Sequence, residues 1–186
     1  DFYVANPDEK ETPVADRLYF TSTEDGKRIK TTQLNTEPIE VTPAVEGVSN
    51  FKSYEAALEA IQTNGKGTEY TITNLIEREF TKTAADILAA IPKEKATKLT
   101  FESGTRTDDD GEAGKLYRIR MRVQTLQLPA EVEVTFQNIV LKYAEGTNSE
   151  IKDAQNKDVQ DLVFVNNGGK LTFGANVKFL AGDKDA

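Results

Sequence analysis

The clearest structural pattern in the sequence lies in VEVTFQNIVLKY (residues 132–143) and LVFVNNGGKLTFGANVKFLAG (residues 162–182). Apolar residues alternate with polar ones in short runs, and turns rather than helices separate the runs. Alternation with a period of two is typical of a strand that buries one face and exposes the other. Each stretch therefore predicts a series of short strands joined by tight turns.

An internal repeat relates these strands. Apolar positions recur at an offset of 37 residues, where Leu126, Leu128, Val134 and Phe136 correspond to Val163, Val165, Leu171 and Phe173. One residue is then inserted and the offset becomes 38, where Asn138, Ile139 and Leu141 correspond to Asn176, Val177 and Phe179. The tetrapeptide KLTF also occurs twice, at residues 98–101 and 170–173. The spacing predicts three strands in each copy.

Equal offsets favour a coil of stacked strands over residues 97–182. In a three-sided coil, each turn buries its inward residues on the turn below. Asn138 and Asn176 fall at matching corners, where Asn tolerates the left-handed conformation and can hydrogen-bond its stacked counterpart. The strands expected to lie in parallel in one sheet are Leu99–Phe101, Val134–Phe136 and Leu171–Phe173. The side chains expected to be buried are those of Phe136, Phe173, Ile139 and Val177.

Two amphipathic helices are expected upstream of this coil, each followed by a strand. The first covers residues 53–64, with Ser53 as its N-cap and Gly65 as its C-cap. Its apolar face consists of Tyr54, Ala57, Leu58 and Ile61. The second covers residues 84–91, with Thr83 as its cap and an equivalent apolar face. We expect the apolar face of the first helix to cover the open end of the coil.

The rest of the chain divides by composition. Residues 1–16 are polar and predict a flexible leader, and residues 17–52 predict short β segments. Within these, Asp25-Gly26 is a hairpin turn signal. Flanking prolines predict an edge position for the strand that contains Ile39 and Val41. Residues 53–186 are expected to form the helix-capped repeats.

The segments quoted above resemble right-handed parallel β-helix proteins of the pectin-lyase-like superfamily. They are most similar to repetitive bacterial surface proteins and lipoproteins, in which a helix such as SYEAALEAIQ commonly precedes the coil. The resemblance implies a mainly β fold with two short helices, built as a right-handed parallel β-helix. A β-sandwich and an α/β solenoid stay open as alternatives, although a sandwich does not explain the equal offsets.

Composition excludes several chemistries. The chain has 186 residues and no Cys or His, which excludes disulfides, zinc–thiolate sites and His-based catalysis. Its net charge of −8 disfavours nucleic acid as a partner. No apolar run approaches the roughly 18 residues of a membrane helix. We expect no cofactor, and a lipid anchor upstream of residue 1 would fit the resemblance.

Two candidate sites emerge. Arg118, Arg120 and Arg122 alternate with apolar residues, so one strand face would carry three guanidinium groups that can bind uronic acids or sulfated glycans. The alternative is a solvated face that nearby acids balance. Asp108, Asp109 and Asp110 could hold calcium through carboxylate oxygens, although their spacing is not that of an EF-hand. The alternative there is a solvated acidic loop.

The family comparison bears on activity. Pectin-degrading hydrolases of the fold use clustered aspartates with a Gly-His-Gly motif and, later in the chain, an Arg-Ile-Lys motif. This chain has no His, and its Arg-Ile-Lys lies at residues 28–30, near the N-terminus instead of after the aspartates. A calcium-assisted lyase would use Arg120 as base beside Asp108–Asp110. Five tyrosines offer sugar-stacking surfaces, but Tyr54 and Tyr70 lie at core positions.

We therefore expect a non-catalytic extracellular or cell-surface module, secreted or lipid-anchored. Its role would be structural or adhesin-like, glycan-facing or part of an outer-membrane assembly. The expected partner is a cell-surface glycan or an outer-membrane protein. The alternative is a fragment related to β-helix polysaccharide lyases or hydrolases.

Overall fold

The computed structural model describes residues 19–22, 29–32, 37–106, 114–123, 125–143 and 162–180. The chain separates into two units, residues 1–36 and 37–186. In the first unit, β1 (Tyr19–Ser22) pairs antiparallel with β2 (Ile29–Thr32), so the predicted hairpin is confirmed. Its turn residues lie outside the described part of the chain, as do residues 1–16.

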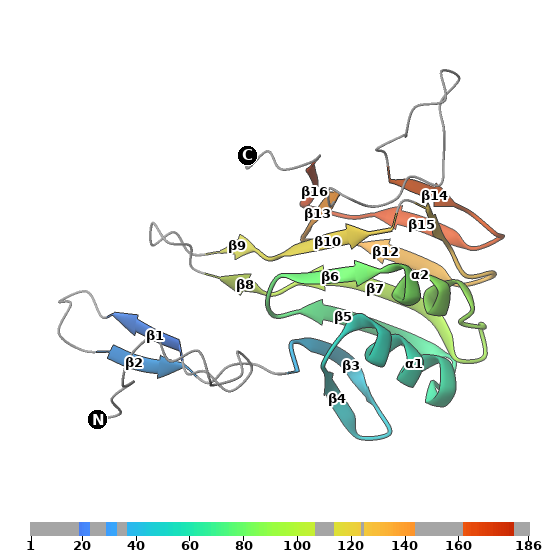
Figure 1. The fold of residues 1–186 in the computed structure, drawn as a ribbon. Helices are drawn as coiled ribbons and strands as arrows, with labels where there is room; N and C mark the ends of the chain where they lie inside the picture. The colour runs from blue at the N-terminus through green and yellow to red at the C-terminus, as the bar shows by residue number, and fades with distance from the viewer. Residues whose placement is uncertain are drawn as a thin grey trace, which may run out of the picture. The chain divides into compact units, whose positions relative to one another are not determined.

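The second unit is mainly β with two short helices, as expected (Figure 1). Its largest sheet has the strand order β15-β12-β7-β5-β3-β4, and a second sheet has the order β16-β13-β10-β6. Two smaller pairs are β11-β14 and the antiparallel pair β8-β9. The strands of the largest sheet are β3 (Ile39–Val45), β4 (Val48–Phe51), β5 (Thr68–Asn74), β7 (Ala96–Ser103), β12 (Glu133–Phe136) and β15 (Lys170–Phe173). The remaining strands are β6 (Arg78–Thr81), β8 (Thr105–Arg106), β9 (Lys115–Leu116), β10 (Arg118–Arg122), β11 (Thr125–Gln127), β13 (Ile139–Tyr143), β14 (Val163–Val165) and β16 (Val177–Leu180).

Consecutive segments of the chain visit these sheets in a repeating order. A strand of the largest sheet is followed by a strand of the second sheet, with the β8-β9 pair inserted between β7 and β10, and then by an element that belongs to neither sheet. The successive groups are β5–β6–α2, β7–β10–β11, β12–β13–β14 and β15–β16. Strands that hold the same place in successive groups pair in parallel (Figure 1). The repeat in the sequence is therefore a repeat in hydrogen bonding.

The predicted parallel strands are confirmed at the level of register. Leu99 pairs with Val134 and Val134 with Leu171, while the three phenylalanines of the same strands form a second row. Their rings stack, with centroids 5.2 Å apart between Phe101 and Phe136 and 6.0 Å apart between Phe136 and Phe173. Stacked aromatic rings at this spacing add to the stabilisation from burial.

The Asn corners are also confirmed. Asn138 and Asn176 have φ values of 45° and 56°, in the left-handed region. The side-chain amide of Asn176 donates to Oδ1 of Asn138 at 3.0 Å. A short side chain that hydrogen-bonds locally offsets the cost of this conformation for a residue other than glycine.

The pair β11 and β14, the first strand of each predicted copy, has a different register from the one predicted. Leu126 pairs with Phe164 rather than with Val163, which makes the offset 38. Phe164 packs against Phe136 and Phe173, at centroid distances of 6.0 and 5.5 Å. A slip of one residue moves a strand's side chains to the opposite face. The segment VFV is apolar at all three positions, so alternation could not identify its inward residue.

Burial of the last group was predicted wrongly. Phe136 and Ile139 are buried, as expected, but Phe173 is 44% exposed and Val177 only half-buried. Phe179 is also exposed. Because β14, β15 and β16 each end their sheet, no described strand covers their outer side. The inward pattern therefore buries a side chain only where another turn lies above it.

The two helices contact each other. The first, α1 (Tyr54–Asn64), begins at Ser53, whose hydroxyl accepts from the amide of Ala56. Its predicted apolar face is buried, and it packs against α2, β3 and β4. The second, α2 (Lys82–Ala89), begins earlier than predicted, because Thr81 rather than Thr83 accepts from the Ala84 amide. Neither helix is long and apolar enough to cross a membrane, within the part of the chain described.

The upstream end of the largest sheet is closed by strands as well as by α1. β3 pairs antiparallel with both β5 and β4, so it is an internal strand and the predicted edge position is wrong. Pro43 is tolerated there because it falls between Glu40 and Val45, where the pairing with β4 is irregular. β4 forms the edge.

Candidate functional site

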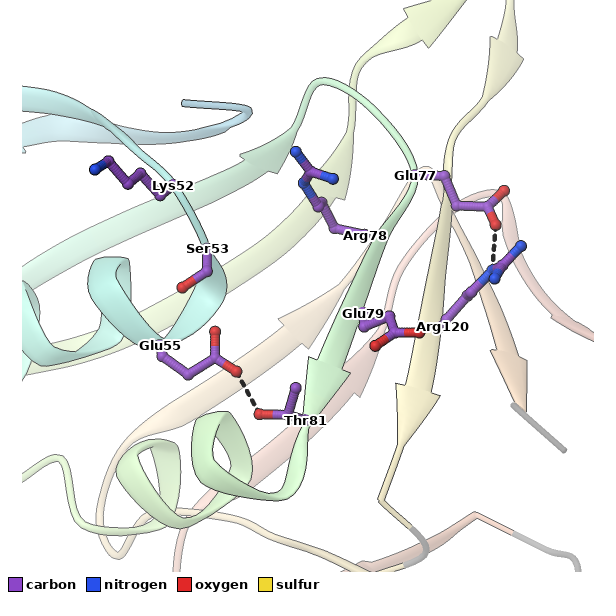
Figure 2. A pocket seen from close by; sticks show the side chains of 8 residues that line it. All are labelled: Lys52, Ser53, Glu55, Glu77, Arg78, Glu79, Thr81 and Arg120. Atoms are coloured by element: carbon purple, nitrogen blue, oxygen red, sulfur yellow. Dashed lines mark hydrogen bonds and ion pairs between the residues drawn. The ribbon is translucent and has the colours of Figure 1, made fainter. Parts of the chain in front are cut away.

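A cleft of about 510 Å³ lies where α1 begins, beside β6. Eight side chains line it: Lys52, Ser53, Glu55, Glu77, Arg78, Glu79, Thr81 and Arg120 (Figure 2). The β4–α1 connection and the first turn of α1 supply three of them, β6 and the residue before it supply four, and β10 supplies Arg120. β6 is the last strand of the second sheet. The cleft lies at this edge of the sheet, between β6 and the start of α1.

The acids of the cleft are engaged by neighbours. Glu77 accepts from Nε of Arg120, and Glu79 forms an ion pair with Arg122 at 2.9 Å. Glu55 accepts a hydrogen bond from the hydroxyl of Thr81 (Figure 2). Burial raises the pKa of Glu55, but hydrogen bonds from Thr81, Ser53 and its own backbone outweigh that effect and lower the pKa overall. Glu55 is therefore ionised at neutral pH and is a poor proton donor.

Two cations of the cleft lack an ion pair within the described residues, Lys52 and Arg78. Register explains the position of Arg78, which pairs with Ile119 and so belongs to an inward row that is otherwise apolar. Its Nε is buried and has no hydrogen-bond partner among the described atoms. The cleft thus combines three engaged carboxylates with three cations, of which Arg120 is paired with Glu77, and this arrangement of charges can hold a polar group.

The predicted arginine row is present on β10. Ile119 and Met121 are buried, so Arg118, Arg120 and Arg122 lie on the opposite face. Arg120 and Arg122 pair with Glu77 and Glu79, which agrees with the alternative in which nearby acids balance the row. A glycan carboxylate at this face would compete with two glutamates.

The acidic candidates Asp108, Asp109 and Asp110 lie outside the described residues, so their distance from β10 is not part of the structure. Two of the tyrosines, Tyr54 and Tyr70, are buried and offer no stacking surface for a sugar. Burial raises the pKa of Tyr54 well above its ordinary value, which keeps the phenol neutral.

Of the residues that line the cleft, sequence reasoning predicted only Arg120 as part of a site. One signal was available, since Glu77 and Glu79 alternate in the same way as Arg120 and Arg122, at a spacing of 43 residues. Opposite charges in matching alternation predict neighbouring strands. Lys52 and Glu55 had no comparable signal, because they belong to the β4–α1 segment, which has no counterpart in the repeat.

The described residues contain no group of three or more His, Cys, Asp or Glu that could hold a metal ion. Several charged residues of the cleft and of β10 form ion pairs between neighbouring strands, as Arg120 does with Glu77 and Arg122 with Glu79. Comparison of the chain with protein-family models, curated proteins and solved structures found no match.

Proposed function

We propose that this chain is a non-catalytic structural module of a secreted or cell-surface protein, built as a short right-handed parallel β-helix. The observation that carries the proposal is the repetition of like side chains in register. The rows contain threonines (Thr71, Thr100, Thr135, Thr172), aromatic rings (Phe101, Phe136, Phe173) and corner asparagines (Asn138, Asn176). Rows of this kind stabilise a repeat scaffold, and none of their residues needs a catalytic role.

Electrostatics support the non-catalytic part of the proposal. A general acid at neutral pH needs a carboxyl whose pKa is raised toward the working pH. The described carboxyls with a resolved shift, Glu55 and Glu133, both have lowered pKa values. In the cleft, Glu77 and Glu79 contact Arg120 and Arg122, and Glu55 accepts a hydrogen bond from Thr81.

Placement at a cell surface rests on the resemblance of the repeats to bacterial surface and lipoprotein members. A structural or adhesin-like role fits the row pattern, and the expected partner is a surface glycan or an outer-membrane protein. Glycan contact would fall on Arg118, Arg120 and Arg122, where two glutamates must be displaced.

The non-catalytic proposal is tested with acidic polysaccharides. The protein is incubated with polygalacturonate, alginate and heparin, with and without calcium, while the absorbance of unsaturated products is followed. We expect no product under any condition. Calcium-dependent product that disappears in Arg120→Gln but persists in Lys82→Gln would overturn the proposal. Lys82 is a suitable control because it lies on α2 and pairs with Asp86 instead.

Glycan contact is tested on the same variants by co-sedimentation with polygalacturonate or by retention on heparin. If the arginine face binds, Arg120→Gln weakens retention and Lys82→Gln does not. Equal retention of both variants and the parent protein would remove the arginine face from the proposal and leave the structural role in place.

A further inference from the structure

The outer side of the last group of strands is an open edge. β14, β15 and β16 are each the terminal strand of their sheet in the described part of the chain. Their exposed apolar side chains are Val165, Phe173 and Phe179. Edge strands normally carry charges, prolines or bulges that prevent pairing. Here each of β15 and β16 has a single lysine, and neither has a proline.

Charges along the largest sheet alternate from strand to strand. Glu69 pairs with Lys98, Lys98 with Glu133, and Glu133 with Lys170. The last step is a direct ion pair, with Lys170 Nζ 3.2 Å from Glu133. Glu133 thus has a lysine on each side, whereas Lys170 has an acid on one side only. Glu69, at the other end of the row, also has a charged partner on one side only, but there the sheet continues with β3, whereas no described strand follows β15.

We propose that this edge is the docking site for an extended strand of a partner protein, which pairs with β15 and places an acidic side chain beside Lys170. The neighbouring rows define the remainder of the docking strand. Apolar side chains would lie over Leu171 and Phe173, and a small polar one, such as threonine, over Thr172. Backbone hydrogen bonds supply affinity in this mode of recognition, and alternate side chains supply specificity.

Charge favours an acidic partner over a second copy of the chain. Residues 162–180 contain two lysines, Lys170 and Lys178, and no acid, although the whole chain has a net charge of −8. Two such edges brought together would place lysines on both sides of the interface. An acidic strand would instead extend the alternation that the sheet already shows.

This inference goes beyond the proposed function, because it names where and what the module binds. A probe is available from the chain itself. A peptide with the sequence AEVEVTFQN, that of residues 130–138, carries the strand that already pairs with β15 on its other side. Its counterpart has lysine in place of the glutamate that corresponds to Glu133. Both peptides are labelled with fluorescein, and binding to the full chain is followed by anisotropy.

We expect the acidic peptide to bind at least about threefold more tightly than the lysine peptide, as cross-strand charge pairs allow. In Lys170→Glu the preference should reverse, which is a gain that an unfolded variant cannot give. Phe173→Ser should weaken binding of both peptides. Val48→Ser should change neither, because Val48 is equally exposed on β4, at the far edge of the same sheet.

Three outcomes would overturn the inference. Equal affinity for the two peptides would remove the charge row as its basis, and an equal loss in Val48→Ser would show non-specific adhesion. Sedimentation velocity supplies the third, since a dimer that Phe173→Ser disrupts would make a second copy the occupant. A failure of peptide binding leaves the polysaccharide assays unaffected, so the two proposals are tested independently.

Discussion

Phe136 and Phe173 hold the same place in successive turns of the repeat, yet the structure treats them differently. Both belong to the same inward row, and their rings stack. Phe136 is 2% exposed and Phe173 is 44% exposed. Alternation therefore determines which way a side chain points, while burial depends on whether a further strand covers it. The interior and the last turn should therefore respond differently to identical substitutions.

The largest expected effect is at the aromatic row. Phe136→Ala should lower the free energy of unfolding by about 3–5 kcal/mol, because it empties a site enclosed on both sides. Phe173→Ala should cost only about 1 kcal/mol, since its ring is partly in water and the site can relax. Urea denaturation followed by circular dichroism measures both values. Equal costs would mean that the last turn is covered in solution.

The corner asparagines provide a second, smaller contrast. The backbone of Asn138 donates to Ala175 and accepts from Ser103, whereas the Asn176 carbonyl accepts from Ile139. Asn138→Ala should destabilise the protein by about 1–2 kcal/mol, because alanine is strained at positive φ. Asn138→Gly should cost less, and Asn176→Ala should cost less than Asn138→Ala because its turn is open on one side. A larger loss from the glycine variant than from the alanine variant would show that φ is not the cause.

The smallest expected effect concerns the ion pair between Glu133 on β12 and Lys170 on β15. The pKa of Glu133 is lowered, chiefly by its hydrogen bond to Lys170, with further contributions from the charges of Lys170 and Lys98. A carboxylate whose folded pKa is lowered stabilises the fold above its unfolded pKa of about 4.3, and this stabilisation is lost as the pH falls through the folded pKa. Lys170→Gln should raise the pKa of Glu133 toward its ordinary value. An NMR titration of the Glu133 side-chain carboxyl carbon in the parent protein and in the variant checks this. If the two proteins gave the same pKa, the ion pair would be excluded in solution.

The sequence predicts the stacked strands well because the repeat supplies independent signals. KLTF and the matching Asn corners predict the register of β7, β12 and β15 to the residue. The register of β14 could not be predicted, since three consecutive apolar residues carry no alternation. The start of α2 was missed because Thr81 and Thr83 are both capable caps, and only packing distinguishes them.

The cleft was beyond sequence reasoning for a different reason. It forms where the repeat begins, so several of its residues have no corresponding residues in another copy with which they could be compared. Lys52 and Glu55 come from the β4–α1 segment, and Arg78 occupies a row that elsewhere contains apolar residues. Exposure of Phe173 escaped prediction for a related reason, because the pattern within a strand carries no information about what lies on its outer side.

Cysteine cross-linking can test whether the parallel strands of the largest sheet pair in the register described. The chain has no natural cysteine, so any disulfide reports on the introduced pair alone. Thr135 and Thr172 are register partners, and their Cα atoms should be about 4.8 Å apart, within disulfide range. Thr135 and Lys170 are diagonal neighbours at about 8 Å, beyond that range. The account predicts rapid intramolecular oxidation of Thr135→Cys/Thr172→Cys and little of Thr135→Cys/Lys170→Cys. Preferential oxidation of the diagonal pair would contradict it.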